Sequence, residues 1–208
     1  DGFEAPPEPV ADVMAPPPGK IEGHGRAGWL IDHAPLNGYI LQHRLLAAGQ
    51  PVFWQEGETK AGRTTLAPGA LWVPASEEAR AILTEAVQNL GLNAHAVSRA
   101  PSGDKIALKP VRVGVVDRYG GSMPSGWTQW LLEQFEYPFD VIYPQALDAG
   151  DLNKTYDVLL FASDLIHEDL HGQRPQPKAE DIPAEVHAML GHISAEKTLP
   201  QIDAFMRQ

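Results

Sequence analysis

Short apolar runs alternate with amphipathic helical patterns along this chain, and no other feature limits its fold as strongly. Between Ala79 and Leu90 apolar residues recur at intervals of three and four, which predicts an amphipathic helix. Ser76 is placed to cap that helix and Gly91 to end it. Strands and helices that alternate over short connections are typical of an α/β protein with a mostly parallel sheet. We therefore expect this fold class.

The same pattern predicts where the elements lie. Strands are expected at 29–31, 52–54, 70–73, 94–97, 111–116, 139–143 and 157–162, the fifth and seventh of them fully buried. Helices are expected at 36–48, 77–90, 124–135, 182–190 and 195–207, with a short turn or helix at 146–150. Residues 57–69 and 165–178 are expected to be irregular loops.

Three regions follow from these elements. Residues 1–22 are expected to be a linker, or a strap over a neighbouring domain, because six prolines favour extended polyproline II structure. Residues 23–100 form a small α/β unit and 101–208 a larger α/β domain. The order strand–helix–strand–strand–helix–strand in 28–97 would also suit a separate ferredoxin-like unit. Both ends lack ordinary boundaries, so we expect a piece of a longer protein.

Composition excludes several classes of function. The net charge of −11, from 27 acidic and 16 basic residues, repels phosphate backbones, so we expect no nucleic acid as a partner. With no cysteine in the chain, disulfides, thiolate metal sites and cysteine nucleophiles are impossible. No apolar run is long enough to predict a membrane span, and no signal peptide is recognisable.

One short string matches a metal-binding motif. His167, Glu168 and His171 fit H-E-x-x-H, in which two histidines on one helical face bind zinc and the glutamate acts as general base. Glu185 and His187 are candidates for a third ligand, although no spacing singles out either of them. A polar surface loop is the alternative, since Gly172 and Pro175 leave little room for a helix.

A glycine-rich loop follows the strand at 111–116. Asp117, Arg118, Gly120, Gly121 and Ser122 lie between this strand and the next helix, where α/β folds place ligand loops. Free N–H groups at the helix start could bind a small anion or contact a partner. The alternative is a tight turn in which Ser122 caps the helix and Pro124 occupies its first turn.

Two further features have ordinary structural explanations. The pair Asp32 and His33 follows a strand and could act as an acid–base couple, but no G-x-S-x-G elbow accompanies it. A cap or a hydrogen-bonded polar group is the more common role of such a histidine. The five tryptophans, at 29, 54, 72, 127 and 130, are expected in the core.

The segment 112–151 resembles a known family. Its string DRYGGSMPSGWT at 117–128, followed by WLLEQF at 130–135, resembles the region C-terminal to the catalytic domain in large bacterial zinc carboxypeptidases. Residues 139–143, 147–152 and 156–161 continue the likeness, and 45–54 also looks like that family. The resemblance covers most of residues 28–208.

The resemblance implies a non-catalytic accessory domain with a flavodoxin-like, class I glutamine-amidotransferase-like fold, truncated at its C-terminus. Parent proteins of this kind are usually exported, which implies a secreted or periplasmic location. Their zinc ligands are a His-x-x-Glu pair and a distant histidine on an upstream peptidase domain, which would be the partner of this chain. No histidine here has glutamate three residues later, so the implied zinc belongs to the parent and this chain holds no cofactor. An independent zinc hydrolase using His167, Glu168 and His171, or a small-anion-binding module, are the alternatives.

Overall fold

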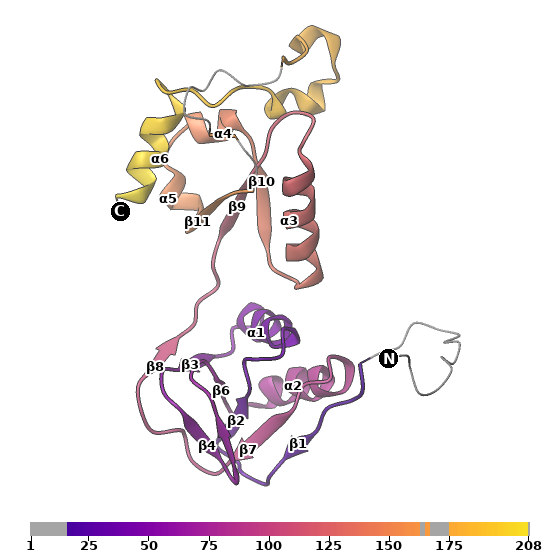
Figure 1. The fold of residues 1–208 in the computed structure, drawn as a ribbon, viewed down its shortest axis with the longest axis vertical. Helices are drawn as coiled ribbons and strands as arrows, with labels where there is room; N and C mark the ends of the chain where they lie inside the picture. The colour runs from indigo at the N-terminus through magenta and orange to yellow at the C-terminus, as the bar shows by residue number, and fades with distance from the viewer. Residues whose placement is uncertain (1–15, 163–164, 167–174, 208) are drawn as a thin grey trace, which may run out of the picture. The chain divides into compact units, whose positions relative to one another are not determined.

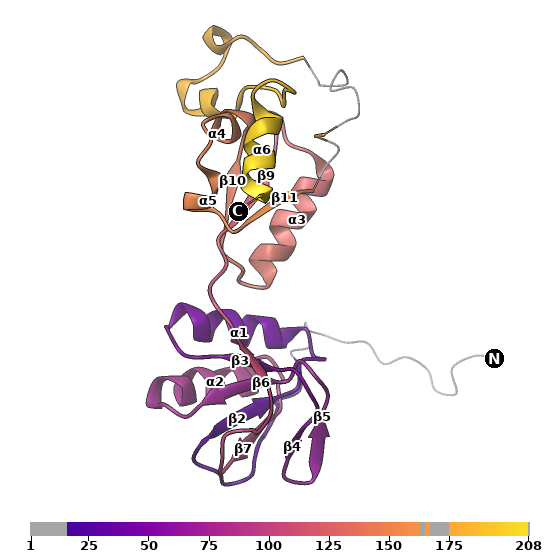
Figure 2. The same ribbon diagram turned by 90° about the vertical axis from the view of Figure 1, so that its left-hand side faces the viewer.

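The computed structural model of the chain describes residues 16–162, 165–166 and 175–207. These residues divide between Lys109 and Pro110 into two compact units, each with a sheet of its own (Figures 1 and 2). The first unit extends beyond the expected boundary at residue 100, because a strand at Lys105–Ala107 pairs with its sheet. The chain is therefore a mixed α/β protein built from two separately packed sheets.

A six-stranded sheet organises the first unit. Its strand order is β1-β7-β2-β6-β3-β8, and the hairpin β4-β5 forms a second, two-stranded sheet (Figure 1). The strands are β1 (Ile21–Glu22), β2 (Gly28–Ile31), β3 (Phe53–Gln55), β4 (Thr59–Ala61), β5 (Thr64–Leu66), β6 (Leu71–Pro74), β7 (Ala94–Val97) and β8 (Lys105–Ala107); the helices are α1 (Asn37–Ala47) and α2 (Glu77–Asn89).

The expectation of a mostly parallel sheet is wrong for this unit. Neighbouring strands are antiparallel in every pair except β1 with β7. The reason is that α1 and α2 each connect two parallel strands that are not adjacent, and an antiparallel strand fills the space between them. The order β7-β2-β6-β3 is the split βαβ arrangement of a ferredoxin-like unit, the alternative that the element order allowed.

Two cores lie on opposite faces of this sheet. Trp29 and Val73 belong to the core that α1 and α2 cover, whereas Leu30 and Trp72, their neighbours along the strands, belong to the other. Ala61 and Leu66 of the β4-β5 hairpin cover this second face. The expected irregular loop at 57–69 therefore contains a hairpin, whose short polar strands gave no apolar run to detect.

Of the expected linker or strap at 1–22, residues 1–15 lie outside the described residues, and residues 16–22 pack on the first unit. The N–H of Gly19 donates to the carbonyl of Val87 at 2.8 Å, and the N–H of Lys20 donates to Asn93 Oδ1 at 2.9 Å. Pro17 lies against Gly91. A Cβ atom added at position 91 would be 2.8 Å from the carbonyl oxygen of Pro17. This proline segment is thus a strap across the end of α2, leading into β1.

The second unit contains a three-stranded parallel sheet of order β10-β9-β11. Here the parallel prediction is confirmed. Helix α3 connects β9 to β10, whereas the two short helices α4 and α5 connect β10 to β11 (Figure 1). The elements are β9 (Val113–Val116), α3 (Met123–Gln134), β10 (Phe139–Ile142), α4 (Pro144–Asp148), α5 (Leu152–Thr155), β11 (Val158–Phe161), two 3-10 helices at Ala179–Asp181 and Ala184–Met189, and α6 (Thr198–Met206).

Strand β9 is the centre of this unit and is buried along its whole length, as expected. The core on one face joins Val116 and Ile142 to Leu147, Leu152 and other apolar residues from α4, α5 and α6. Strand β11 was expected to be fully buried but is only half-buried, with Val158 exposed. Within the described residues it has a strand neighbour on one side only, which explains the difference.

Candidate functional site

The candidate site in the second unit begins at Asp117, immediately after β9. This side chain is only 5% exposed, and its carboxylate accepts two hydrogen bonds. Oδ1 accepts from the N–H of Arg118 at 2.8 Å, and Oδ2 accepts from Nε2 of Gln129 in α3 at 3.2 Å. The N–H of Asp117 donates to the carbonyl of Ile142 at 2.9 Å. A buried carboxylate with both oxygens bonded is held firmly at the corner between β9 and α3.

The start of α3 is closed by its own residues. Ser122 Oγ accepts from the N–H of Ser125 at 3.2 Å, and the carbonyl of Ser122 accepts from the N–H of Gly126 at 2.9 Å. Pro124 has no N–H at all. Ser122 thus caps the helix and Pro124 lies in its first turn, as the turn interpretation predicted. The donors that an anion would use at positions 124–126 are absent or already paired.

Gly120 and Gly121 let the loop reverse before the helix. Both have positive φ, 80° and 63°, which side chains rarely adopt. The N–H of Gly121 donates to the carbonyl of Arg118 at 2.8 Å and closes the turn. The structure therefore brings all five predicted loop residues together. The anion-binding role of this loop stays a prediction.

Two residues of this cluster, Gln129 and Tyr143, were missed from the sequence. Gln129 joins Asp117 to Ser125, because its Nε2 also lies 3.0 Å from Ser125 Oγ. Tyr143, which follows β10, has its pKa raised, first by burial and then by the negative charge of Asp117. Ser125 and Gln129 are four residues apart, and this spacing could have predicted that they share one face of the helix. No sequence pattern pointed to Tyr143.

The structure describes only two residues of the zinc hypothesis, Glu185 and His187. His167, Glu168 and His171 lie outside the described residues. Glu185 and His187 lie in the second 3-10 helix, where His187 Nε2 is 3.2 Å from the carbonyl oxygen of Ile182. Among the described residues, no cluster of three or more histidine, aspartate or glutamate side chains could hold a metal ion.

Asp32 and His33 lie in the first unit, after β2. The Nδ1 of His33 is 3.6 Å from Asp32 Oδ1, which also accepts from the N–H of Ala34 at 3.1 Å. The aspartate therefore closes a local turn, with the histidine ring beside it. The pair is in the first unit, and the Asp117 cluster is in the second.

The outer face of α3 is apolar and exposed, which the sequence did not predict. Trp127 is 60% exposed and Trp130 is 47% exposed, so the expectation of a core position is wrong for both. Their rings meet edge to face, with centroids 5.6 Å apart. Met123 and Leu131 extend the same exposed surface. Trp29 and Trp72 are buried as expected, and Trp54 packs partly buried against the first core.

Comparison of the chain with protein-family models, curated proteins and solved structures finds no match. In the part of the chain that the structure describes, no helix has the length and apolar character needed to span a membrane.

Proposed function

We propose that this chain is a non-catalytic accessory domain of a zinc carboxypeptidase-like metallopeptidase. In this proposal an upstream domain of the same polypeptide carries the zinc and the catalysis, and the whole protein is exported. The chain contributes by packing on the peptidase domain or by presenting substrate to it. The likeness of residues 117–135 to that family is the sequence support.

The structural observation that carries the proposal is the α3 surface, formed by Met123, Trp127, Trp130 and Leu131. Large apolar side chains that gather on one exposed face mark interaction sites more often than free surface. Tryptophan contributes strongly to binding because it buries a large rigid area on contact. These four residues lie within the string that resembles the family. The same segment therefore supports both the family likeness and the docking surface.

The flavodoxin-like fold belongs to this proposal as well. The sheet order β10-β9-β11 corresponds to second, first and third strand, with which the flavodoxin-like order begins. In such sheets the loop after the first strand lies at a ligand-binding edge. In this chain the corresponding loop begins at the buried Asp117 and ends at the helix cap Ser122, which favours a structural role for it over a catalytic one.

The first test compares the purified chain with the full-length polypeptide. Both are assayed, with and without zinc, for release of the C-terminal residue from a blocked dipeptide. We expect zinc-dependent turnover by the full-length protein only. Turnover by the chain alone, or one tight zinc site that disappears in His167→Ala, would assign it metal chemistry of its own and overturn the proposal.

The second test measures docking. The chain is titrated with the separately purified peptidase domain, and the double variant Trp127→Ala/Trp130→Ala should bind at least tenfold more weakly. Met206→Ala is the matched control, because Met206 is a 71% exposed apolar side chain on another helix, α6. Equal binding by all three proteins would contradict docking through α3.

A further inference from the structure

A cavity in the first unit lies beside α1, well separated in sequence from the α3 surface. It has a volume of about 250 Å³ and is lined by residues of α1, β3 and β6 and of the loops after β2 and β5. That is room for roughly eight waters at ~30 Å³ each, somewhat less than the pockets that hold drug-sized ligands. The lining residues are His33, Gly38, Tyr39, Gln42, Trp54, Pro68, Gly69 and Leu71.

The histidine that lines the cavity lies between Gly69 and Asp32. Gly69 lies so close to the ring of His33 that a Cβ at position 69 would be 3.2 Å from the ring carbon Cγ. Gly69 also has φ +93°, which favours glycine. Asp32 lies 3.6 Å from Nδ1 on the ring. The imidazole thus contributes an aromatic surface to the cavity, with Nδ1 on the side of the aspartate.

A hydrogen bond joins the side chains of Gln42 and Trp54. The indole Nε1 of Trp54 donates to Gln42 Oε1 at 3.2 Å. An indole N–H can only donate, so the amide atom that meets it must be the oxygen. The two N–H donors of the Gln42 amide are therefore at the other end of the group. Gln42 lines the cavity, and these donors suit a carbonyl oxygen.

We propose that this cavity binds an aromatic ring that bears a carbonyl group. Three aromatic side chains, those of His33, Tyr39 and Trp54, line it and favour a ring in stacked or edge-to-face contact. The Gln42 amide supplies the hydrogen bond to the carbonyl oxygen. Such a group can come from a free small molecule or from an aromatic residue of a peptide. The inference is independent of the proposed function, because it concerns only side chains of the first unit.

The test is a titration of the ¹⁵N-labelled chain followed by amide and indole N–H signals. Benzamide represents the free small molecule and N-acetyl-phenylalaninamide the peptide residue. We expect saturable shifts of the Trp54 indole signal and of the Gly38 and Gly69 amides. Tighter binding of one probe identifies the source. Toluene, which is neutral like benzamide and has the ring but no carbonyl, should bind at least fivefold more weakly than benzamide.

Two variants make the test specific. Gln42→Glu keeps an oxygen for the Trp54 indole but removes the amide donors, and should lower benzamide affinity at least fivefold. Gln88→Glu makes the same chemical change on an exposed part of α2 and should leave affinity unchanged. Tyr39→Ala, at a 40% exposed position, should also weaken binding without disturbing the core. No shifts at the cavity, or equal affinity in Gln42→Glu and the unaltered chain, would overturn the inference.

Discussion

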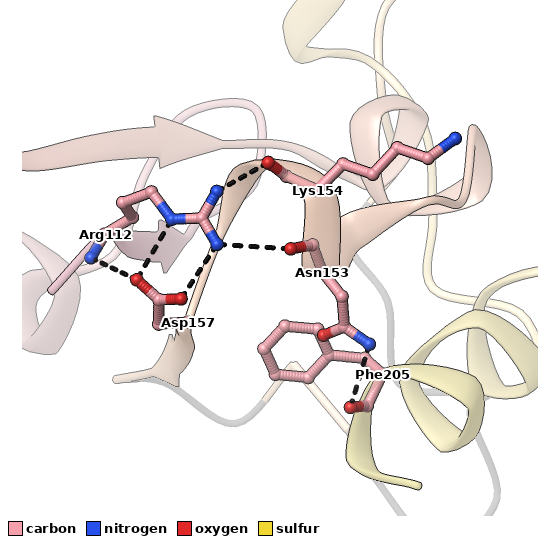
Figure 3. Close-up of polar contacts among 5 residues, drawn as sticks. All are labelled: Arg112, Asn153, Lys154, Asp157 and Phe205. Atoms are coloured by element: carbon pink, nitrogen blue, oxygen red, sulfur yellow. Dashed lines mark hydrogen bonds and ion pairs between the residues drawn. The ribbon is translucent and has the colours of Figure 1, made fainter. Parts of the chain in front are cut away.

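Arg112 binds Asp157 through a two-pronged ion pair that joins the starts of two neighbouring strands. Its Nε lies 3.0 Å from Oδ2 and its Nη2 lies 2.8 Å from Oδ1 (Figure 3). The same guanidinium donates to the carbonyls of Asn153 and Lys154, at the end of α5. Asn153 in turn donates from Nδ2 to the carbonyl of Phe205 in α6. Only a planar group with several N–H donors can make these contacts together.

Asp157 should make the stability of the second unit pH-dependent in acid. Hydrogen bonds from Arg112 lower the pKa of Asp157 from 3.8 to about 2. A carboxylate whose pKa is lower in the folded state stabilises the fold above its unfolded pKa. That contribution is lost as the pH falls from about 4 to 2. In urea unfolding followed across this range, Asp157→Asn should remove part of the pH dependence.

A matched control for this prediction lies nearby. Asp151 pairs with Lys154 at 2.7 Å, but both side chains are about three-quarters exposed. Exposed pairs of this kind contribute little to stability. Asp151→Asn should therefore leave the acid profile unchanged, and an equal effect of both variants would contradict a special role for Asp157.

Removing the charge of Asp117 should lower the pKa of Tyr143. That pKa is raised by burial first and by the charge of Asp117 second, so Asp117→Asn should lower it while leaving it above its ordinary value of 10.0. Tyrosinate absorbance, titrated with and without Tyr143→Phe, isolates this group. Asp140→Asn is the control, because Asp140 raises the pKa of Tyr156 instead.

The raised tyrosine pKa values also predict a loss of stability in alkali. Tyr137, Tyr143 and Tyr156 all have their pKa raised by burial. A group with a raised folded pKa stabilises the fold below its unfolded pKa, and the contribution disappears as the pH rises through the folded pKa. Thermal unfolding of the second unit should therefore shift to lower temperature above pH 10. The shift should be smaller in Tyr137→Phe, which cannot ionise.

Gly28 should tolerate no side chain. A Cβ there would lie 2.2 Å from the carbonyl oxygen of Val73 and 2.6 Å from the ring of Trp72. Backbone and a buried ring cannot move aside cheaply, so Gly28→Ala should destabilise the first unit by about 3 kcal/mol. Gly57 has no atom within 4 Å of the same position, and Gly57→Ala should change stability by less than about 0.5 kcal/mol. Urea unfolding of both variants checks the contrast.

The exposed tryptophans should be accessible to a neutral quencher. Acrylamide should reach Trp127 and Trp130 but not Trp29 or Trp72, which are 2% and 3% exposed. The double variant Trp127→Phe/Trp130→Phe should therefore lose most of the quenchable fluorescence. A quenchable fraction as large as that of the unaltered chain would show that other tryptophans are the exposed ones.

Local signals in the sequence predicted individual elements well. Ser76 and Ser122 cap α2 and α3, because the side-chain oxygen of a serine before a helix can accept from a backbone N–H of the first turn. Residues 113–116 form the expected buried strand, because a short run rich in valine favours strand over helix. In the candidate site, the loop from Asp117 to Ser122 could be predicted because it lies between this strand and the helix that Ser122 caps.

Partners distant in sequence could not be predicted. Periodicity identifies a strand but not its neighbour, so the antiparallel sheet of the first unit was mistaken for a parallel one. Strand β8 is exposed throughout and has no apolar pattern at all. Trp127 and Trp130 have the same helical spacing whether they face a core or solvent, and only tertiary structure distinguishes the two cases.

The central position of β2 has a consequence for synthesis on the ribosome. Both neighbours of this strand come later in the chain: Ile31 pairs with Leu71 in β6 and with Ala94 in β7. At translation rates of about 5–20 residues per second, β2 waits roughly 3–13 s for β7 to emerge. Throughout that time Trp29, Leu30 and Ile31 have no strand beside them on the β7 side. The sheet of the first unit therefore cannot be completed until β7 has been synthesised, and β9, the central strand of the second unit, waits in the same way for β11.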